Sequence, residues 1–320
     1  MTMVSTGDAA TAATPEFVPL SKHIGCEVKG IDLRKPLRPD TISAIYRAWL
    51  DHAVLLFRDQ DLSQEDLIRV TGHFGEFAPL GRPAHTLPKG FSRLLPNIMM
   101  ISNIRENGET IGALPDGEMM FHHDTIHRED PHKATLLYSV EIPTYGGDTL
   151  FASGTAAYDT LDEKVKAKVE GRRAVNYYVY NSVVRGDKQG VDATSQAAHP
   201  VIRTHDETNR KAIYVNRLMT VKIEGMSEQE SDALLNFLFD HCEKPEFVYT
   251  HVWRKGDLVV WDNLAPATRA LTSLRISVAC CCEPPSRGPR GPIRRRHIVF
   301  EGFLGFFVRA DRRHAGAASI

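Results

Sequence analysis

The chain has 320 residues, of which 42% are hydrophobic and 25% charged, and its formal net charge is −1. This composition is that of an ordinary globular protein, and the balanced charge gives neither a basic excess for nucleic acid nor an acidic tail. No apolar run approaches the length needed to cross a bilayer, and five cysteines, three of them contiguous, do not make a disulfide framework. We expect a cytoplasmic protein that binds neither nucleic acid nor membranes.

The first half of the chain predicts a disordered lead followed by alternating short strands and helices. Residues 1–15 are rich in Thr and Ala and lack the basic and apolar regions of a secretory signal. The next elements, in chain order, are short strands within 17–33, a helix over 40–51 capped by Asp40 or Thr41, a buried strand over 53–57, a helix over 67–74 after the capping-box pattern Ser63-x-x-Asp66, and loops over 76–118.

The second half predicts more strands. The expected elements are a strand over 135–140, a turn over 143–147, a helix over 156–171, a hairpin of 201–204 with 212–215, a helix from Ser227-x-x-Glu230 to 241, and a hairpin of 248–253 with 258–261. Many short strands with interspersed helices favour an all-β barrel with helical decoration over a parallel βαβ sheet.

One sharp change in composition follows residue 265. From Pro266 to Ile320 the chain contains Arg but neither Lys nor Asn, and it is dense in Pro, Gly and Ala. We therefore divide the chain into the lead, one domain over 16–265, and an aberrant tail over 266–320 that we expect to be poorly ordered or non-native.

The first motif with chemical content is Phe121-His122-His123-Asp124. On an extended segment, alternate residues point the same way, so His122 and Asp124 can face one point while His123 faces elsewhere. An imidazole and a carboxylate are two thirds of the facial triad that holds Fe(II) and leaves positions open for a 2-oxo acid and O2. By itself the pattern is weak, because this chain holds 14 histidines.

Two further motifs follow. Tyr145-Gly-Gly-Asp-Thr149 is a tight turn that enters a strand, and the Thr149 hydroxyl could donate to a carboxylate inside a barrel. The segment 253–263, WRKGDLVVWDN, alone indicates only a hairpin with an aromatic cap.

In this order, the three motifs resemble those of the TauD/TfdA family of Fe(II)/2-oxoglutarate-dependent dioxygenases, which typically show W-H-x-D, G-G-D-T and W-D-N-R-x-x-x-H. Phe121 stands for the first Trp, and similar stretches extend the resemblance over roughly 17–263. The resemblance implies a double-stranded β-helix (a jelly-roll, cupin-like barrel), Fe(II) on His122 and Asp124, and 2-oxoglutarate as a co-substrate contacted by Thr149.

The chain departs from the family pattern in the tail. Thr268 stands where the third ligand, a His, is expected, Ala279 where an Arg meets 2-oxoglutarate, and Glu283 where a second Arg often meets the substrate anion. Codons can be chosen so that a one-base shift restores the His, both Arg and an apolar closing strand. We hypothesise a single-base deletion, or a sequencing error, at the codon for Pro266.

The resemblance implies hydroxylation of a small anionic molecule such as a sulfonate, a sulfate ester or an aryloxy acid, with His127, Tyr178 and Met219 as candidate pocket residues. Without the third ligand and the closing strand, we expect little turnover from this polypeptide and an exposed barrel edge. The alternatives are a non-catalytic jelly-roll binding protein and, less readily, a zinc hydrolase on His122, His123 and Asp124. A homo-oligomer is compatible with either.

Overall fold

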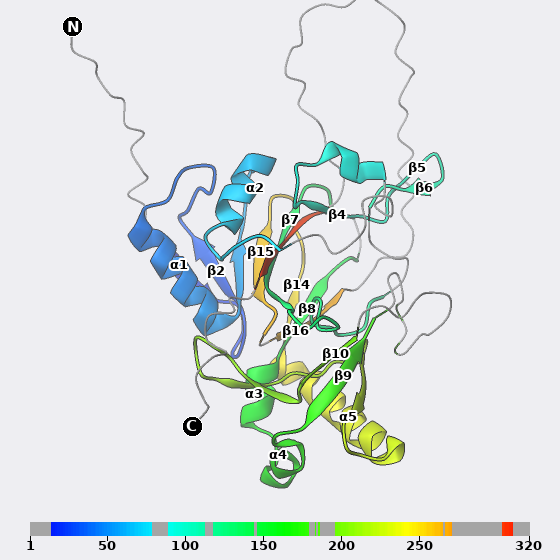
Figure 1. Cartoon of the computed structure of the whole chain (residues 1–320). Helices are drawn as coiled ribbons and strands as arrows, with labels where there is room; N and C mark the ends of the chain where they lie inside the picture. The colour runs from blue at the N-terminus through cyan, green and yellow to red at the C-terminus, as the bar shows by residue number, and fades with distance from the viewer. Residues whose placement is uncertain are drawn as a thin grey trace, which may run out of the picture.

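The protein is described by a computed structural model covering residues 14–78, 89–112, 118–143, 146–178, 183, 185, 196–264, 266–270 and 303–309, the last two by their backbone. The described chain is mainly β (Figure 1). No helix within these ranges has both the length and the apolar character needed to span a membrane.

The largest element is a seven-stranded sheet. Its strands, in spatial order, are β1 (Glu16–Pro19), β2 (Cys26–Lys29), β3 (Val54–Phe57), β15 (Leu258–Asp262), β7 (His132–Ser139), β17 (Phe303–Arg309) and β4 (Met99–Ile101). Only β2 and β3 run parallel, and every other neighbouring pair is antiparallel. The sheet therefore joins strands that are far apart in the sequence.

The two faces of this sheet bury different cores, because side chains alternate along each strand. Leu258 and Val260 of β15 pack with the apolar side chains of α1 (Pro39–His52) and α2 (Gln64–Thr71). Val259 and Trp261 face the other way and pack with Phe151. Phe151 belongs to β8 (Thr149–Ser153), which lies between β14 (Val248–His251) and β16 (Pro266–Ala270). One side of the large sheet is thus covered by helices and the other by a second sheet.

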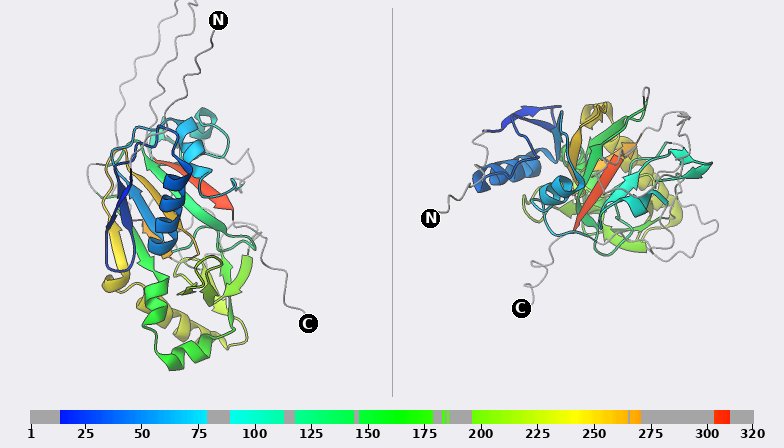
Figure 2. Two further views of the ribbon diagram at one scale, coloured as in Figure 1. Left: turned by 90° about the vertical axis from the view of Figure 1, so that its left-hand side faces the viewer. Right: turned by 90° about the horizontal axis from the view of Figure 1, so that it is seen from above.

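A third group of elements packs around its own apolar core, at the lower end of the molecule in the left view of Figure 2. It comprises α3 (Gly154–Asp159), α4 (Glu163–Val169), α5 (Glu228–Cys242), the sheet β10 (Gln196–Pro200), β9 (Arg173–Tyr177) and β13 (Thr220–Ile223), and the hairpin β11 (Ile202–Thr204) and β12 (Lys211–Ile213). Smaller elements are η2 (Lys89–Arg93), η3 (Pro245–Phe247) and the hairpin β5 (Arg105–Glu106) and β6 (Glu109–Thr110).

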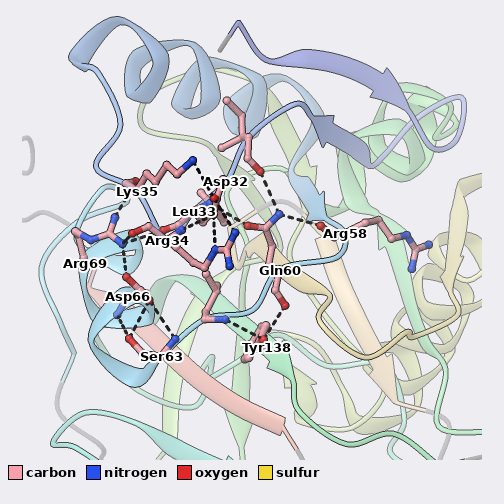
Figure 3. Close-up of polar contacts among 12 residues, drawn as sticks. Asp32, Leu33, Arg34, Lys35, Arg58, Gln60, Ser63, Asp66, Arg69 and Tyr138 are labelled. Carbon is pink, nitrogen blue, oxygen red and sulfur yellow. Dashed lines mark hydrogen bonds and ion pairs between the residues drawn. The ribbon is translucent and has the colours of Figure 1, made fainter. Parts of the chain in front are cut away.

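The loop after β3 is fastened by Gln60 (Figure 3). The side-chain oxygen of Gln60 accepts a hydrogen bond from the Leu33 N–H at 2.9 Å. The backbone carbonyl oxygen of Gln60 accepts a hydrogen bond from the Tyr138 hydroxyl at 2.8 Å. Gly256 lies so close to this loop, at φ +83°, that a Cβ there would come within 2.6 Å of the Gln60 carbonyl oxygen. These contacts explain why the turn before β15 contains glycine.

Most elements predicted from the sequence are confirmed, including the Ser63 and Ser227 capping boxes and the hairpin of β11 with β12. The single helix over 156–171 is wrong, because Ser153 and Asp162 each cap a separate helix, α3 and α4. The cap of α1 is also wrong: Arg38 is the N-cap, and Asp40 lies in the first turn.

The hairpin of 248–253 with 258–261 is wrong as well. β14 pairs with β8, whereas β15 pairs with β3 and β7, so the turn between them crosses from one sheet to the other. The exposed barrel edge stays a prediction: β17 pairs with β7 along its length, but β14 and β16 are the edge strands of the second sheet among the described residues. Two strands, β16 and β17, therefore fall inside the segment that we expected to be poorly ordered.

Candidate metal and co-substrate site

His122 and Asp124 face each other in the segment that leads into β7. The His122 Nε2 and Asp124 Oδ1 atoms lie 3.5 Å apart, and both side chains are largely buried. His122 Nδ1 lies 2.9 Å from the Met120 carbonyl oxygen. Because a carbonyl can only accept, Nδ1 carries a hydrogen, so Nε2, which faces the carboxylate, is the atom that can bind a metal once the proton that Asp124 favours on it has left. This tautomer is the one that a metal-binding imidazole needs.

Asp124 is held by a relay from two neighbouring strands. The Thr135 hydroxyl on β7 donates to Asp124 Oδ2 at 2.6 Å, and the Asn263 amide donates to the Thr135 oxygen at 2.8 Å. Asn263 directly follows β15, which pairs with β7, so the sheet register places the two residues together. The relay occupies Oδ2 and leaves Oδ1 on the side of His122.

The charges of the pair support each other. Burial alone would lower the pKa of His122, but the Asp124 carboxylate outweighs it and raises that pKa above the ordinary value. Burial likewise opposes ionisation of Asp124, yet hydrogen bonds from His122 and Thr135 lower the pKa of the carboxyl. Asp124 is therefore an anion at neutral pH, as a ligand of a divalent cation must be.

His123 turns away from this point. Its ring packs at 4.7 Å, between centroids, from Tyr214, and its Nδ1 lies 3.2 Å from the Asn216 amide nitrogen. Burial, reinforced by His122, lowers the pKa of His123 to about 3, so the ring is neutral. A neutral imidazole could bind a metal, but His123 does not gather with His122 and Asp124 into a three-residue metal cluster among the described side chains, as the zinc-hydrolase alternative requires.

The third protein ligand of a facial triad is not formed by the described side chains. Nowhere in the described ranges do three His, Cys, Asp or Glu side chains gather so as to hold a metal ion. Thr268 lies on β16 opposite Phe151 of β8, two residues from Thr149. The expected position of the third ligand therefore lies on the strand that pairs with Thr149, while Ala279 and Glu283 lie outside the described residues.

Thr149 is placed at the start of β8, between two strands. Its backbone pairs with His251 of β14 on one side and with Ala270 of β16 on the other. Its hydroxyl oxygen accepts a hydrogen bond from the Trp253 indole nitrogen at 3.0 Å. Both side chains are buried. The indole N–H therefore occupies one of the two lone pairs of the Thr149 oxygen.

The three candidate pocket residues share one neighbourhood. His127 is buried, and its ring centroid lies 5.5 Å from that of Tyr178. Tyr178 and Met219 belong to one apolar cluster, which also contains Met120, the residue whose carbonyl meets His122. Burial, together with Arg128, lowers the pKa of His127 to about 4. A neutral, largely apolar wall therefore lies next to the His122 segment.

Three side chains that act on the site were missed by the sequence interpretation. Trp253 and Asn263 lie in the third motif, and their positions at its two ends were the available signal. Thr135 had none, because a Thr in a predicted strand is ordinary and only the register of β7 with β15 brings it to Asn263.

With this geometry in place, comparison with known proteins identifies the lineage. The family model "Taurine catabolism dioxygenase TauD, TfdA family" matches residues 16–266. The chain belongs to the TauD/TfdA family. The alpha-ketoglutarate-dependent 2,4-dichlorophenoxyacetate dioxygenase of Cupriavidus pinatubonensis is 31% identical over 257 residues, which cover 77% of this chain and 88% of that protein.

Two other TauD/TfdA relatives extend the comparison. An alpha-ketoglutarate-dependent sulfate ester dioxygenase of Pseudomonas putida is 29% identical over 278 residues, covering 81% of this chain and 86% of that protein. The crystal structure of AAD-2 in complex with Mn(II) and N-oxalylglycine superposes with a TM-score of 0.71 at 27% identity, covering 92% of this chain and 97% of that one. TauD/TfdA proteins are dioxygenases that depend on Fe(II) and 2-oxoglutarate, and this chain has their fold.

Proposed function

We propose that the domain is a jelly-roll barrel that holds Fe(II) on His122 and Asp124 and uses 2-oxoglutarate to hydroxylate a small anionic organic molecule. The observation that carries this proposal is the convergence of His122 Nε2 and Asp124 Oδ1, each with its other polar atom already engaged. When bound, the metal supplies the redox chemistry that couples decarboxylation of 2-oxoglutarate to oxidation of a C–H bond.

The protein residues have simpler tasks. His122 offers a neutral imidazole lone pair, and Asp124 offers one anionic oxygen whose partner oxygen is held by Thr135. Thr149 offers a hydroxyl hydrogen to the far carboxylate of 2-oxoglutarate. His127, Tyr178 and Met219 form a wall that excludes water near the reacting centre. The relatives named above act on an aryloxy acid and on sulfate esters, which supports a small anion as the substrate.

We further propose that this polypeptide, as its sequence stands, turns over little or not at all. Two protein donors hold a divalent metal far less tightly than three, and Ala279 cannot pair with a carboxylate. Fe(II) and 2-oxoglutarate added without oxygen should give no visible metal-to-ligand absorption band, and no succinate should form when oxygen is admitted. A clear band followed by succinate release would contradict this statement.

A non-catalytic small-molecule binding protein of the same fold is the second candidate. The observation in its favour is the intact pocket wall beside a site with two donors among the described side chains. The two candidates differ in their response to a restored third ligand. Iron-dependent succinate release should then appear only if the oxygenase is the ancestral function.

A further inference from the structure

The Thr149 hydroxyl has one hydrogen, and the structure determines what that hydrogen can do. The Trp253 indole nitrogen donates to the Thr149 oxygen at 3.0 Å, and an indole nitrogen never accepts. The oxygen is therefore the acceptor of this bond, and its own hydrogen points elsewhere. No acceptor for that hydrogen is found among the side chains that the structure describes. A buried hydroxyl hydrogen without an acceptor indicates room for a hydrogen-bond acceptor at this point.

Trp253 is itself held in place. Its ring lies edge-on to His251, with centroids 4.4 Å apart and an interplanar angle of 85°. His251 is directly opposite Thr149 in the register of β14 with β8, so the residue that supports the indole ring shares a backbone pair with the residue that the indole binds. The Tyr249 hydroxyl lies 3.2 Å from His251 Nδ1, and the Asp257 carboxylate lies 3.2 Å from its Nε2. The indole cannot rotate away without disturbing this buried group.

We propose that Trp253 is a positioning residue that turns the Thr149 hydroxyl hydrogen away from the indole, so that it can donate to a carboxylate at this end of the pocket. A carboxylate oxygen placed there would give the hydroxyl hydrogen the acceptor that it lacks among the described side chains. This inference rests on the proposed function, in which Thr149 meets the far carboxylate of 2-oxoglutarate. It adds a residue outside the metal ligands to the recognition of the co-substrate.

The chain contains a matched control in Trp261. Trp261 is buried in the same apolar cluster as Trp253, but its indole nitrogen has no hydrogen-bond partner within the described residues. Replacing either tryptophan by phenylalanine removes one indole N–H and leaves an aromatic ring. Only the Trp253 substitution removes a hydrogen bond to the proposed site.

The test is a titration of the full chain with 2-oxoglutarate, followed by ligand-observed NMR, which measures dissociation constants in the millimolar range. Trp253→Phe should weaken binding about fivefold or more, as the loss of one well-placed hydrogen bond does, and Trp261→Phe should change it by less than about twofold. Thr149→Val should weaken binding at least as much as Trp253→Phe, whereas Thr149→Ser, which keeps the hydroxyl, should bind nearly as the unmodified chain does.

The double variant Thr149→Val with Trp253→Phe separates positioning from packing. If Trp253 acts through the hydroxyl, the double variant binds no more weakly than Thr149→Val alone. A further loss in the double variant, or unchanged binding by Trp253→Phe, overturns the inference and leaves the proposed function standing. Absence of any 2-oxoglutarate binding by the unmodified chain overturns the co-substrate pocket itself, and the inference with it. Thermal unfolding of each variant checks that the fold is retained.

Discussion

The two sides of the proposed metal site come from regions of opposite character. On one side, His122 and Asp124 lie in the part of the chain that matches the family model, and each is anchored by a hydrogen bond to the surrounding fold. On the other side, the chain leaves β15, enters β16 and carries Thr268 where the family pattern has a histidine. The match to the family model ends at residue 266, next to the change in composition.

The difference teaches that the contacts that hold Asp124 and Thr149 are present although Thr268 stands at the proposed position of a third ligand. The relay from Asn263 through Thr135 to Asp124 is complete, and Thr149 is still bonded to Trp253. Buried polar groups of this kind are costly unless they are paired, and here they are paired. A supported half-site beside an unrelated tail fits an abrupt change at the codon for Pro266 better than gradual loss of a whole site.

The strongest way to break this comparison is to restore the reading frame by inserting one base at the codon for Pro266. If the hypothesis is right, the new chain has His at position 268 and Arg at position 279, and iron-dependent succinate release should rise at least about a hundredfold. Loss of an outer-shell contact alone typically costs 10- to 100-fold, and a direct ligand costs more. Succinate formed from 2-oxoglutarate with and without Fe(II) measures the effect.

The control is the same restored chain with Asp124→Ala, which should release no succinate above background. Sequencing the gene is an independent check: if the shifted frame does not encode a His and an Arg at these positions, the frameshift hypothesis is wrong. A restored chain that folds and binds 2-oxoglutarate but stays inert would favour the binding-protein alternative.

Individual residues show which features the sequence alone predicted. The alternation of an extended segment correctly separated His122 and Asp124 from His123, because side-chain direction on such a segment depends only on local geometry. Capping boxes at Ser63 and Ser227 were equally readable, since a helix start is specified within four residues. Local physics was sufficient in each case.

Other features that the sequence did not predict correctly depend on pairing between strands that are far apart in the chain. The segment between β14 and β15 has the pattern of a hairpin, yet its strands belong to different sheets, and only their partners β8 and β3 decide this. Thr135 became recognisable as a support of Asp124 only when the register of β7 with β15 was known. The strand β17, in the tail, pairs with β7, and no local sequence pattern predicts that pairing.

A second, smaller effect tests whether the retained side of the site is built for a metal. In the frame-restored chain, Thr135→Val removes the donor to Asp124 Oδ2 and the acceptor of the Asn263 amide. We expect the affinity for Mn(II), measured by electron paramagnetic resonance of the free ion, to fall about 10- to 100-fold.

Two matched variants serve as controls for this measurement. Thr135→Ser keeps the hydroxyl and should bind Mn(II) nearly as tightly as the parent. Thr71→Val removes another buried threonine hydroxyl, one that donates to the Leu67 carbonyl within α2, and should cost stability without changing metal affinity. Equal Mn(II) affinity in the Thr135→Val variant and its parent would show that the relay is structural only.

The smallest expected effect is a pH dependence of the unfolding free energy, and it arises from histidines near His122 and Asp124. Burial lowers the pKa of both His127 and His132 to about 4, with Asp124 acting against it and Arg128 with it. The unfolded chain takes up these protons near pH 6.5, so the folded state loses stability as the pH falls from about 6.5 to about 4. Each histidine should cost about 1 kcal/mol of unfolding free energy between pH 7.5 and 5.5.

The variant His127→Gln removes one of these titrating groups. The unfolding free energies of variant and parent are measured in urea at both pH values. At the lower pH, the difference between them should shift by about that amount in favour of the variant. A difference that stays constant with pH would mean that His127 is protonated in the folded protein, and the wall beside His122 would then carry a positive charge at the lower pH.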